Sequence, residues 1–255
     1  MVELKSPGEI DAMREAGLVV GNALAAVRQR AAVGVSLREL DAVARDALAA
    51  AGARSTFLGY HPPFAPAPFP AVICASVNDV ALHGIPSAYR LRDGDVLSVD
   101  CGASVDGWAA DAAETVIVGE AQPEDVRLVE ATRAALDAGI AAARPGNRIG
   151  DVSAAIGAVA RRAGYGVNTD YGGHGIGRRM HEDPSVPNDG RRGRGLPLRA
   201  GLVVAIEPWF LAGGRPGYRV DDDGWTLRSA DGSRAAHQEH TVAITPDGPR
   251  ILTAA

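Results

Sequence analysis

VLSVDCGASVDGWAADAAETVIV, residues 96 to 118, is a long strand-like run with a turn signal near its middle. Apolar and β-branched residues on both sides of Asp106-Gly107 predict a β-hairpin with a tight turn at that dipeptide. Asp100 and Asp111 stand eleven residues apart about the turn, so we expect them to face each other across the ladder. Two carboxylates in that position repel each other unless a cation lies between them. The alternative is that one of them is an ordinary turn or surface residue.

Helical and strand-like segments surround this hairpin. Ser6-Pro7 and a capping box formed by Ser36 and Glu39 mark two helix starts, and Gly52 marks a helix end. A proline-rich stretch, GYHPPFAPAPFP, can continue neither a helix nor a strand ladder. Helices are predicted over 7–32, 36–52, 123–143 and 148–163, and further strands over AVICASV, 201–211, 217–221 and 238–243.

A weak internal repeat links the two pairs of helices. Gly34 aligns with Gly146, and Gly52 aligns with Gly164, without a gap. Two interpretations fit this pattern. Either two alanine-rich amphipathic helices simply look alike, or an α/β half is duplicated and a ligand site lies between the halves.

Composition excludes several classes of protein. Of the 255 residues, 46% are apolar and 22% are charged, which is typical of a globular domain with a substantial core. The net charge of −5, without a basic helix face, argues against direct nucleic-acid binding. No apolar run is long enough for a membrane span, and MVELKSPGEI lacks the apolar core of a signal peptide, so we expect a cytoplasmic location.

Two more carboxylates lie at strand ends. Glu207 in VVAIEPW follows a buried-looking strand and precedes a proline, and Glu239 in HQEHTVAI begins another apolar strand. A single acid at a strand end is ordinarily solvated. If both converge with Asp100 and Asp111, four ionised carboxylates in a low-dielectric site need counter-charge, which two divalent cations would supply.

The glycine-rich run GGHGIGRRMHEDP, residues 172 to 184, carries His174 and His181. It matches neither of the common glycine-rich phosphate-binding patterns. Its glycines would let the backbone approach a site closely, so that His174 could supply a nitrogen ligand to a metal. A tight turn with surface histidines is the alternative, and a purely structural role is likewise open for His83 in VALHGIP and for His181 when each is considered singly.

Taken together, VALHGIP, VDCGASVDGWAAD, GGHGIGRRMHEDP, AIEPW and QEHT resemble the methionine aminopeptidases, in that order and at fitting distances. The resemblance is to the type I bacterial form and covers nearly the whole chain. It implies an α+β pita-bread fold, shared with creatinase, in which two pseudo-symmetric halves surround a dinuclear metal site. We therefore expect one catalytic domain over residues 1–255, with halves at about 7–120 and 121–250.

The resemblance implies a role for each motif residue. His83 would lie beside the substrate and help to orient it or to hold the intermediate. His181 would hydrogen-bond the scissile amide or the developing oxyanion. Glu207 would pass a proton to the leaving amine, and Asp100 would help to bind the free α-amino group. The implied metal ligands are Asp100, Asp111, His174, Glu207 and Glu239.

The implied reaction removes the N-terminal methionine from nascent proteins and peptides, with a preference for a small second residue. A hydroxide that bridges two divalent metal ions would attack the scissile carbonyl, because the metals lower the pKa of the bound water. Four carboxylates and one imidazole suit cobalt, manganese or iron (Co, Mn, Fe), and Zn is a further candidate. The chain's own start, Met1-Val2, fits this substrate preference.

The implied partners are the N-termini of nascent polypeptides, and the family suggests a monomer with no membrane partner. The basic run GRRGRG at 190–195 is interpreted as a solvated loop rather than as a ribosome contact. Docking near the ribosomal exit would nevertheless suit the substrate.

The expected methionine pocket departs from the family pattern. Its substrate-binding wall would consist of Tyr60, Phe69, Cys74 and Trp225, but a longer, proline-rich segment separates Tyr60 from Cys74. These extra residues, 61–68, fall at the rim of the pocket. They either form a stiff lid that reshapes it or are an ordinary surface insertion.

Two other functions remain to be weighed. Xaa-Pro aminopeptidases and prolidases share the fold and the dinuclear site, but they generally carry an additional N-terminal domain that this chain is too short to hold. A non-catalytic binding protein on the same fold would have lost metal ligands, whereas all five motif positions are intact here.

Overall fold

Helices fill one layer of the molecule. The structure is a computed structural model that describes residues 2–254, so Met1, on which the expectation about the start of the chain rests, lies outside the described residues. None of the helices in this range is long and apolar enough to cross a membrane. They are α1 (Pro7–Arg30), α2 (Leu37–Ala50), α3 (Pro123–Ala142) and α4 (Ile149–Ala163).

Strands form one large sheet and two small ones. The large sheet runs β1-β4-β5-β14-β9-β7-β8, with β15 beside β14 and β2 beside β4. The small sheets run β13-β10-β6 and β11-β12-β3. The strands are β1 (Arg54–Ser55), β2 (Ile73–Val77), β3 (Val80–Leu82), β4 (Val96–Val105), β5 (Trp108–Ile117), β6 (Gly166–Val167), β7 (Gly173–Gly175), β8 (Glu182–Val186), β9 (Val203–Ile206), β10 (Trp209–Leu211), β11 (Tyr218–Val220), β12 (Leu227–Ser229), β13 (Ala235–His237), β14 (Glu239–Thr245) and β15 (Gly248–Ile251).

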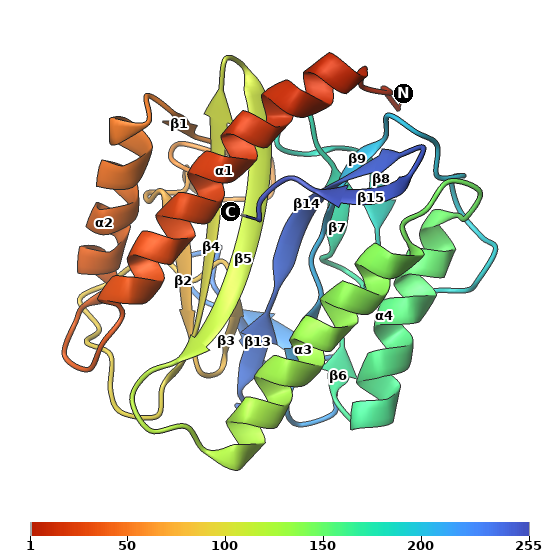
Figure 1. Ribbon diagram of the computed structural model, residues 1–255. Coiled ribbons are helices and arrows are strands. Elements are labelled where there is room, and N and C mark those ends of the chain that lie inside the picture. Colours follow the sequence, from red (N-terminus) through yellow and green to blue (C-terminus); the bar gives the residue numbers. More distant parts are fainter. Residues whose placement is uncertain (1, 255) are drawn as a thin grey trace.

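The helices cover the large sheet in two pairs. Figure 1 shows α1 crossing the β4–β5 hairpin with α2 beside it, while α3 and α4 pack together in front of β14 and β9. One apolar cluster joins α1 and α2 to β4 and β5, and a second joins α3 and α4 to β9 and β14. Burial of these two clusters holds the helices on the sheet.

The hairpin is confirmed, with its turn at Asp106-Gly107. These residues have φ angles of 49° and 77°, the left-handed conformation that a two-residue hairpin turn of this type requires. The expectation that Asp100 and Asp111 stand directly opposite each other is wrong. Asp100 pairs with Ala113 and Asp111 pairs with Gly102, because the ladder closes on Val105 and Trp108. The two aspartates are therefore diagonal neighbours on one face of the sheet.

Strand alternation separates this face from the core. On β4, Val99 and Cys101 belong to the cluster under α1 and α2, whereas Asp100 between them points to the opposite face. On β5, Ala110 and Ala112 lie in the same cluster, and Asp111 points away from it. The face that the helices leave open thus receives both carboxylates.

The aligned helix pairs begin in the same way. Gly34 and Gly146 have φ angles of 87° and 93°, and α2 and α4 each begin three residues later, at Leu37 and Ile149. Gly164 is the C-cap of α4 in the left-handed conformation, and Gly52, the glycine that aligns with it, has a φ of 64°. The division into two halves stays a prediction, which these shared conformations favour.

Candidate metal centre

One cavity of about 380 Å³ collects every side chain that the sequence singled out. These residues come from segments that are far apart in the chain, from the stretch before β2 to the start of β14. They are Tyr60, Phe69, Cys74, His83, Asp100, Asp111, His174, His181, Glu207, Trp225 and Glu239.

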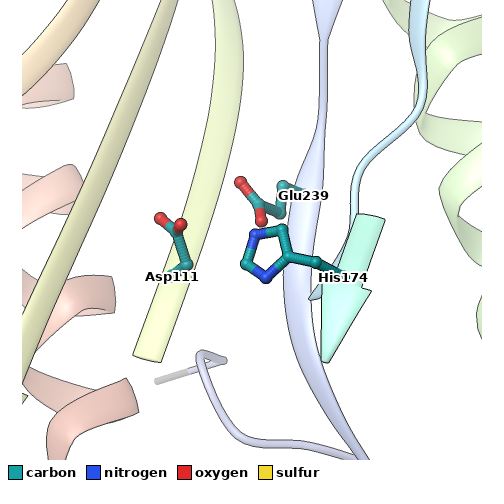
Figure 2. Close-up of side chains that lie close together, drawn as sticks. All are labelled: Asp111, His174 and Glu239. Carbon is teal, nitrogen blue, oxygen red and sulfur yellow. The ribbon is translucent and has the colours of Figure 1, made fainter. Parts of the chain in front are cut away.

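Three of the expected ligands can hold a single ion. Asp111 on β5, His174 on β7 and Glu239 on β14 each offer one ligand atom, and these atoms lie within 4.8 Å of one another. Figure 2 shows the three side chains turned toward a common point from three separate strands. All three residues are buried. Such convergence of two carboxylates and an imidazole fits a divalent transition metal.

The other two expected ligands stand beside these three. Glu207 follows the last residue of β9, Ile206, which pairs with His240 on β14, so Glu207 lies next to Glu239 across the sheet. An oxygen of Glu207 lies 3.5 Å from Nε2 of His174. Asp100 lies diagonal to Asp111 on the hairpin. All five side chains therefore border one small volume.

Burial and mutual repulsion in this volume disfavour the ionised forms of the four carboxyl groups. Burial raises the pKa of Glu207 to about 8, and the charge of Asp111 adds to the shift. Burial also raises the pKa of Asp111 to about 6, although a hydrogen bond with Asp100 partly offsets this. The pKa values of Asp100 and Glu239 are raised by burial first and then by the neighbouring carboxylates. A cation among them would remove this penalty.

Buried oxygens without hydrogen-bond partners also indicate a cation site. Among residues 2–254, Oδ1 of Asp100, Oδ1 of Asp111 and Oε1 of Glu239 are buried and have no hydrogen-bond partner. A buried carboxylate oxygen without a partner costs free energy unless it ligates a cation. The residues present therefore fit a site for divalent metal ions.

The orientation of His174 supports the same conclusion. Its Nδ1 lies 2.9 Å from the carbonyl oxygen of Gly175, an acceptor only, so Nδ1 carries the proton and donates it. Nε2 is then left with a free lone pair facing the carboxylates. Fixing the imidazole through its other nitrogen is the usual arrangement around a metal-ligating histidine.

In the metal-free protein, the free energy of unfolding should decrease as the pH rises from 7 to 8.5. The pKa of Glu207 is about 8 in the folded protein, against an ordinary value of 4.5, so the unfolded chain binds fewer protons there. The free energy of unfolding then decreases with pH, by about 1 kcal/mol, or a few degrees in Tm. Burial lowers the pKa of His83, His174, His181 and His237, so their contribution to stability increases with pH and partly offsets this decrease near pH 7. Thermal melts in chelator should show this slope, and Glu207→Gln should flatten it; a rising Tm would contradict the assignment.

His83 and His181 flank these five side chains. His83 follows β3 with a φ of 56°, and such strain in a non-glycine residue is concentrated at functional sites. The ring of His181 lies 4.3 Å from that of His174 and 5.3 Å from that of Tyr60. Burial lowers the pKa of both histidines, that of His83 to about 4, so both are neutral at pH 7.

An apolar end of the cavity adjoins the ligands. Phe69, Cys74 and Trp225 are each at most 6% exposed and belong to one cluster with Tyr60 packed against it. Phe69 and Trp225 meet edge to face, with ring centroids 5.2 Å apart. These four residues, expected as the substrate-binding wall, therefore form a closed apolar pocket beside the carboxylates.

His237 and Thr241 support the site but were not predicted from the sequence. His237 is buried, and its Nε2 lies 3.8 Å from Glu207. It stands two residues before Glu239, a spacing that can place two strand residues on one face, and this signal could have revealed it. Thr241 donates from Oγ1 to the carbonyl of Asp111 at 2.8 Å and accepts from the amide of Asp111 at 2.9 Å. It thereby ties β14 to β5 where the two carboxylates meet.

A buried ion pair anchors the segment that carries His181. Nζ of Lys5 lies 2.9 Å from Oε2 of Glu182, with side-chain exposures of 2% and 9%. The other oxygen of Glu182 accepts a hydrogen bond from the amide of Arg179 at 3.0 Å. The backbone amide of Lys5 donates to Gly201. The N-terminal segment is thus connected to the residue that follows His181.

Comparisons with known proteins agree with this geometry. Residues 11–246 match the model of metallopeptidase family M24. The methionine aminopeptidase 1 of Mycobacterium tuberculosis (strain CDC 1551 / Oshkosh) is 52% identical over 260 residues, which cover 99% of this chain and 95% of the relative. The methionine aminopeptidase of Aquifex aeolicus (strain VF5) is 45% identical over 255 residues, with 99% and 98% covered.

Solved structures show the same similarity. The crystal structure of the methionine aminopeptidase from Thermotoga maritima has a TM-score of 0.95 and 39% identity, with both chains fully covered. The prolidase from Pyrococcus furiosus has a TM-score of 0.77 and 22% identity, and the match covers 99% of this chain but 65% of the prolidase. The second comparison shows a common fold, the pita-bread arrangement expected from the sequence.

Proposed function

We infer that this chain, which belongs to metallopeptidase family M24, removes the N-terminal methionine from nascent proteins and peptides in a metal-dependent reaction. The single observation that carries this function is the convergence of four carboxylates and His174 beside a closed apolar pocket. The cluster suits two divalent metal ions, and the pocket suits an unbranched apolar side chain such as that of methionine.

We assign the five ligand positions to Asp100, Asp111, His174, Glu207 and Glu239. When bound, two divalent cations supply polarisation of the scissile carbonyl and a water of lowered pKa. Support for the assignment comes from the three ligand atoms within 4.8 Å of one another and from the buried oxygens without partners among residues 2–254.

Recognition of the chain end follows from the position of the acids. With the methionine side chain against Phe69, Cys74 and Trp225, the α-amino group lies toward the carboxylates. A cationic ammonium group there meets Asp100, which faces the same cavity. An internal residue of a polypeptide lacks this charge, so the site selects N-termini.

Proton transfer is assigned to Glu207, whereas the two flanking histidines bind and orient the reacting groups. Glu207 lies within 4 Å of the Nε2 atoms of His174 and His237, so it can hold a proton and deliver it to the leaving amine. His181, which is neutral, can donate a hydrogen bond to the developing oxyanion. His83 borders both the pocket and Trp225, with ring centroids 6.5 Å apart, and orients the substrate.

Replacing His181 by alanine should lower kcat for Met-Ala-Ser by about 10²-fold, because one donor to the oxyanion is lost. KM should change much less, since the interaction strengthens in the transition state. Steady-state kinetics at saturating metal measures both constants. His181→Gln, which keeps an N–H donor, should recover part of the loss. A raised KM with an unchanged kcat would instead make His181 a binding residue only.

The experiment that tests the function compares three classes of peptide. Metal-stripped protein is reloaded with Mn, Fe, Co or Zn and assayed on Met-Ala-Ser, Met-Leu-Ser and Xaa-Pro peptides, with Asp100→Ala and Glu239→Ala as controls. We expect metal-dependent cleavage of Met-Ala-Ser alone, lost in both variants. Cleavage of Xaa-Pro peptides would move the chain to the prolidase branch. No cleavage by a folded, metal-loaded protein would favour a binding protein.

We further propose that the enzyme acts as a cytoplasmic monomer close to the ribosome. A nascent substrate supports this placement, whereas the exposed arginines of the 190–195 loop are in keeping with a solvated loop. Sedimentation of the purified protein, alone and with ribosomes at increasing salt, tests both parts. A dimer, or no cosedimentation at low salt, would overturn the corresponding part.

A further inference from the structure

Phe64 stands apart from the other aromatic residues of the cavity. It lines the same cavity as the metal ligands, yet its side chain is 65% exposed, whereas Phe69 is 3% and Trp225 is 6% exposed. Phe69 and Trp225 form the closed end of the pocket. Phe64 therefore marks the mouth, where the cavity opens to solvent.

The segment that carries Phe64 is held in place. At its base, the amide of Phe69 donates to the carbonyl of Tyr60 at 2.9 Å, and the amide of Gly59 donates to the carbonyl of Phe69 at 2.9 Å. Within residues 61–68, the amide of Ala65 donates to the carbonyl of Pro62 at 3.1 Å. The four prolines of this segment each fix one backbone angle. The loop is consequently stiff rather than a free flap.

The loop also rests on the pocket wall. Nε1 of Trp225 donates to the carbonyl of Ala67 at 2.9 Å. Gly224 permits the close approach of Pro66, since a Cβ at Gly224 would lie 2.4 Å from Cδ of Pro66. The ring of Phe64 meets that of Trp225 edge to face, with centroids 6.1 Å apart. Contact with Trp225 thus fixes one side of the Phe64 ring, and the other side faces the open mouth of the cavity.

A single exposed phenylalanine is ordinary on a protein surface. Phe64 differs because a stiff, proline-rich loop holds it against the wall of the cavity, at the opening through which a bound peptide must leave. With methionine in the closed end and the first peptide bond at the carboxylates, the residues after the second one pass this mouth. An apolar side chain there can cover the free face of the Phe64 ring.

We propose that Phe64 is a specificity-determining residue that binds an apolar side chain of the substrate at the third or fourth position. The proposal rests on the proposed function and extends it to the substrate class. Peptides such as Met-Ala-Leu-Ser are then preferred over Met-Ala-Ser-Ser. The segment 61–68 is, on this assignment, a fixed part of the binding site and not an incidental insertion.

The test compares kcat/KM for Met-Ala-Leu-Ser, Met-Ala-Ser-Leu and Met-Ala-Ser-Ser, with methionyl-alanine amide as a substrate that ends before the mouth. The wild-type enzyme should prefer one of the leucine peptides by about three- to tenfold. Phe64→Ala should abolish this preference, and Phe64→Leu should retain part of it. Val33→Ala, which removes another exposed apolar side chain outside the cavity, should keep the wild-type preference.

The outcomes separate this inference from the proposed function. Equal rates on the three tetrapeptides, or a preference that survives Phe64→Ala, would overturn the role of Phe64 while methionine removal stands. A loss in Phe64→Ala that is as large on methionyl-alanine amide as on the leucine peptides would place Phe64 in the methionine pocket instead. Failure of the wild-type enzyme on every substrate, including the amide, would overturn the function, and this inference with it.

Discussion

Replacing Glu239 by glutamine should lower kcat/KM for Met-Ala-Ser by at least about 10³-fold, the largest effect that we expect from a single substitution. Glu239 supplies one of three ligand atoms that lie within 4.8 Å of one another, and its side chain is buried at the start of β14. Glutamine has nearly the same shape but no charge to balance a divalent cation. Metal affinity and polarisation of the carbonyl should both be lost.

The same substitution should stabilise the metal-free protein. Burial and the charges of Asp111, Glu207 and Asp100 raise the pKa of Glu239, so its ionised form is disfavoured in the folded state. An uncharged amide removes this repulsion, and thermal melts in chelator should show a higher Tm than that of the wild type. Metal should then raise the Tm of the wild type far more than that of the variant.

Glu114→Gln is the matched control for Glu239→Gln. Glu114 lies on β5 beside Ala113, the residue that pairs with Glu239, but its carboxylate is 2.8 Å from Arg28 and does not line the cavity. We expect activity within about threefold of the wild type, because Glu114 lies outside the cavity and its partly exposed ion pair contributes little to stability. Activity of Glu239→Gln within tenfold of wild type at matched metal loading would contradict its assignment as a ligand.

Replacing Lys5 by methionine should lower the free energy of unfolding by about 3 kcal/mol, because it leaves Glu182 buried and without its cation. For a chain of this size, that corresponds to a decrease in Tm of about 6–12 °C. The expectation follows from side-chain exposures of 2% and 9% and from a distance of 2.9 Å between the charged atoms. Chemical and thermal unfolding of the metal-loaded protein measure the effect.

A double-mutant cycle distinguishes the ion pair from packing. Lys5→Met and Glu182→Gln together should cost less than the sum of the single changes, since neither partner is then left charged and alone. Arg30→Met is the control on the surface, where Arg30 and Glu39 are 50% and 44% exposed, and it should cost less than about 1 kcal/mol. Strict additivity of Lys5→Met and Glu182→Gln would rule out a stabilising pair.

Sequence signals correctly predicted the helix starts and the hairpin turn, because these features depend on a few neighbouring residues. The capping box of Ser36 and Glu39 is present, and the Asp106-Gly107 turn forms where its conformational preference requires. Strand alternation correctly placed Asp100 and Asp111 on one face. Their exact pairing was not predicted, because register depends on where the turn closes, and a change of two positions keeps the face while altering the partner.

The candidate site could be anticipated only as a set of motifs. Strand-end acids such as Glu207 and Glu239 are usually solvated, and the sequence alone does not reveal which of them converge. His237 and Lys5 escaped notice because their significance lies in buried contacts with residues 30 and 177 positions away in the chain. Proximity across a sheet is a property of the assembled fold.

Local sequence patterns account for the helices, the hairpin and the residue types of the site, because caps, turns and strand periodicity act over a few residues. It is the assembled fold that brings Asp111, His174 and Glu239 on β5, β7 and β14 within 4.8 Å, and that places Phe64 at the mouth of the cavity. These positions arise from strand order and from the packing of the 61–68 loop on Trp225. Both are set by burial and pairing between distant segments, which no local pattern encodes.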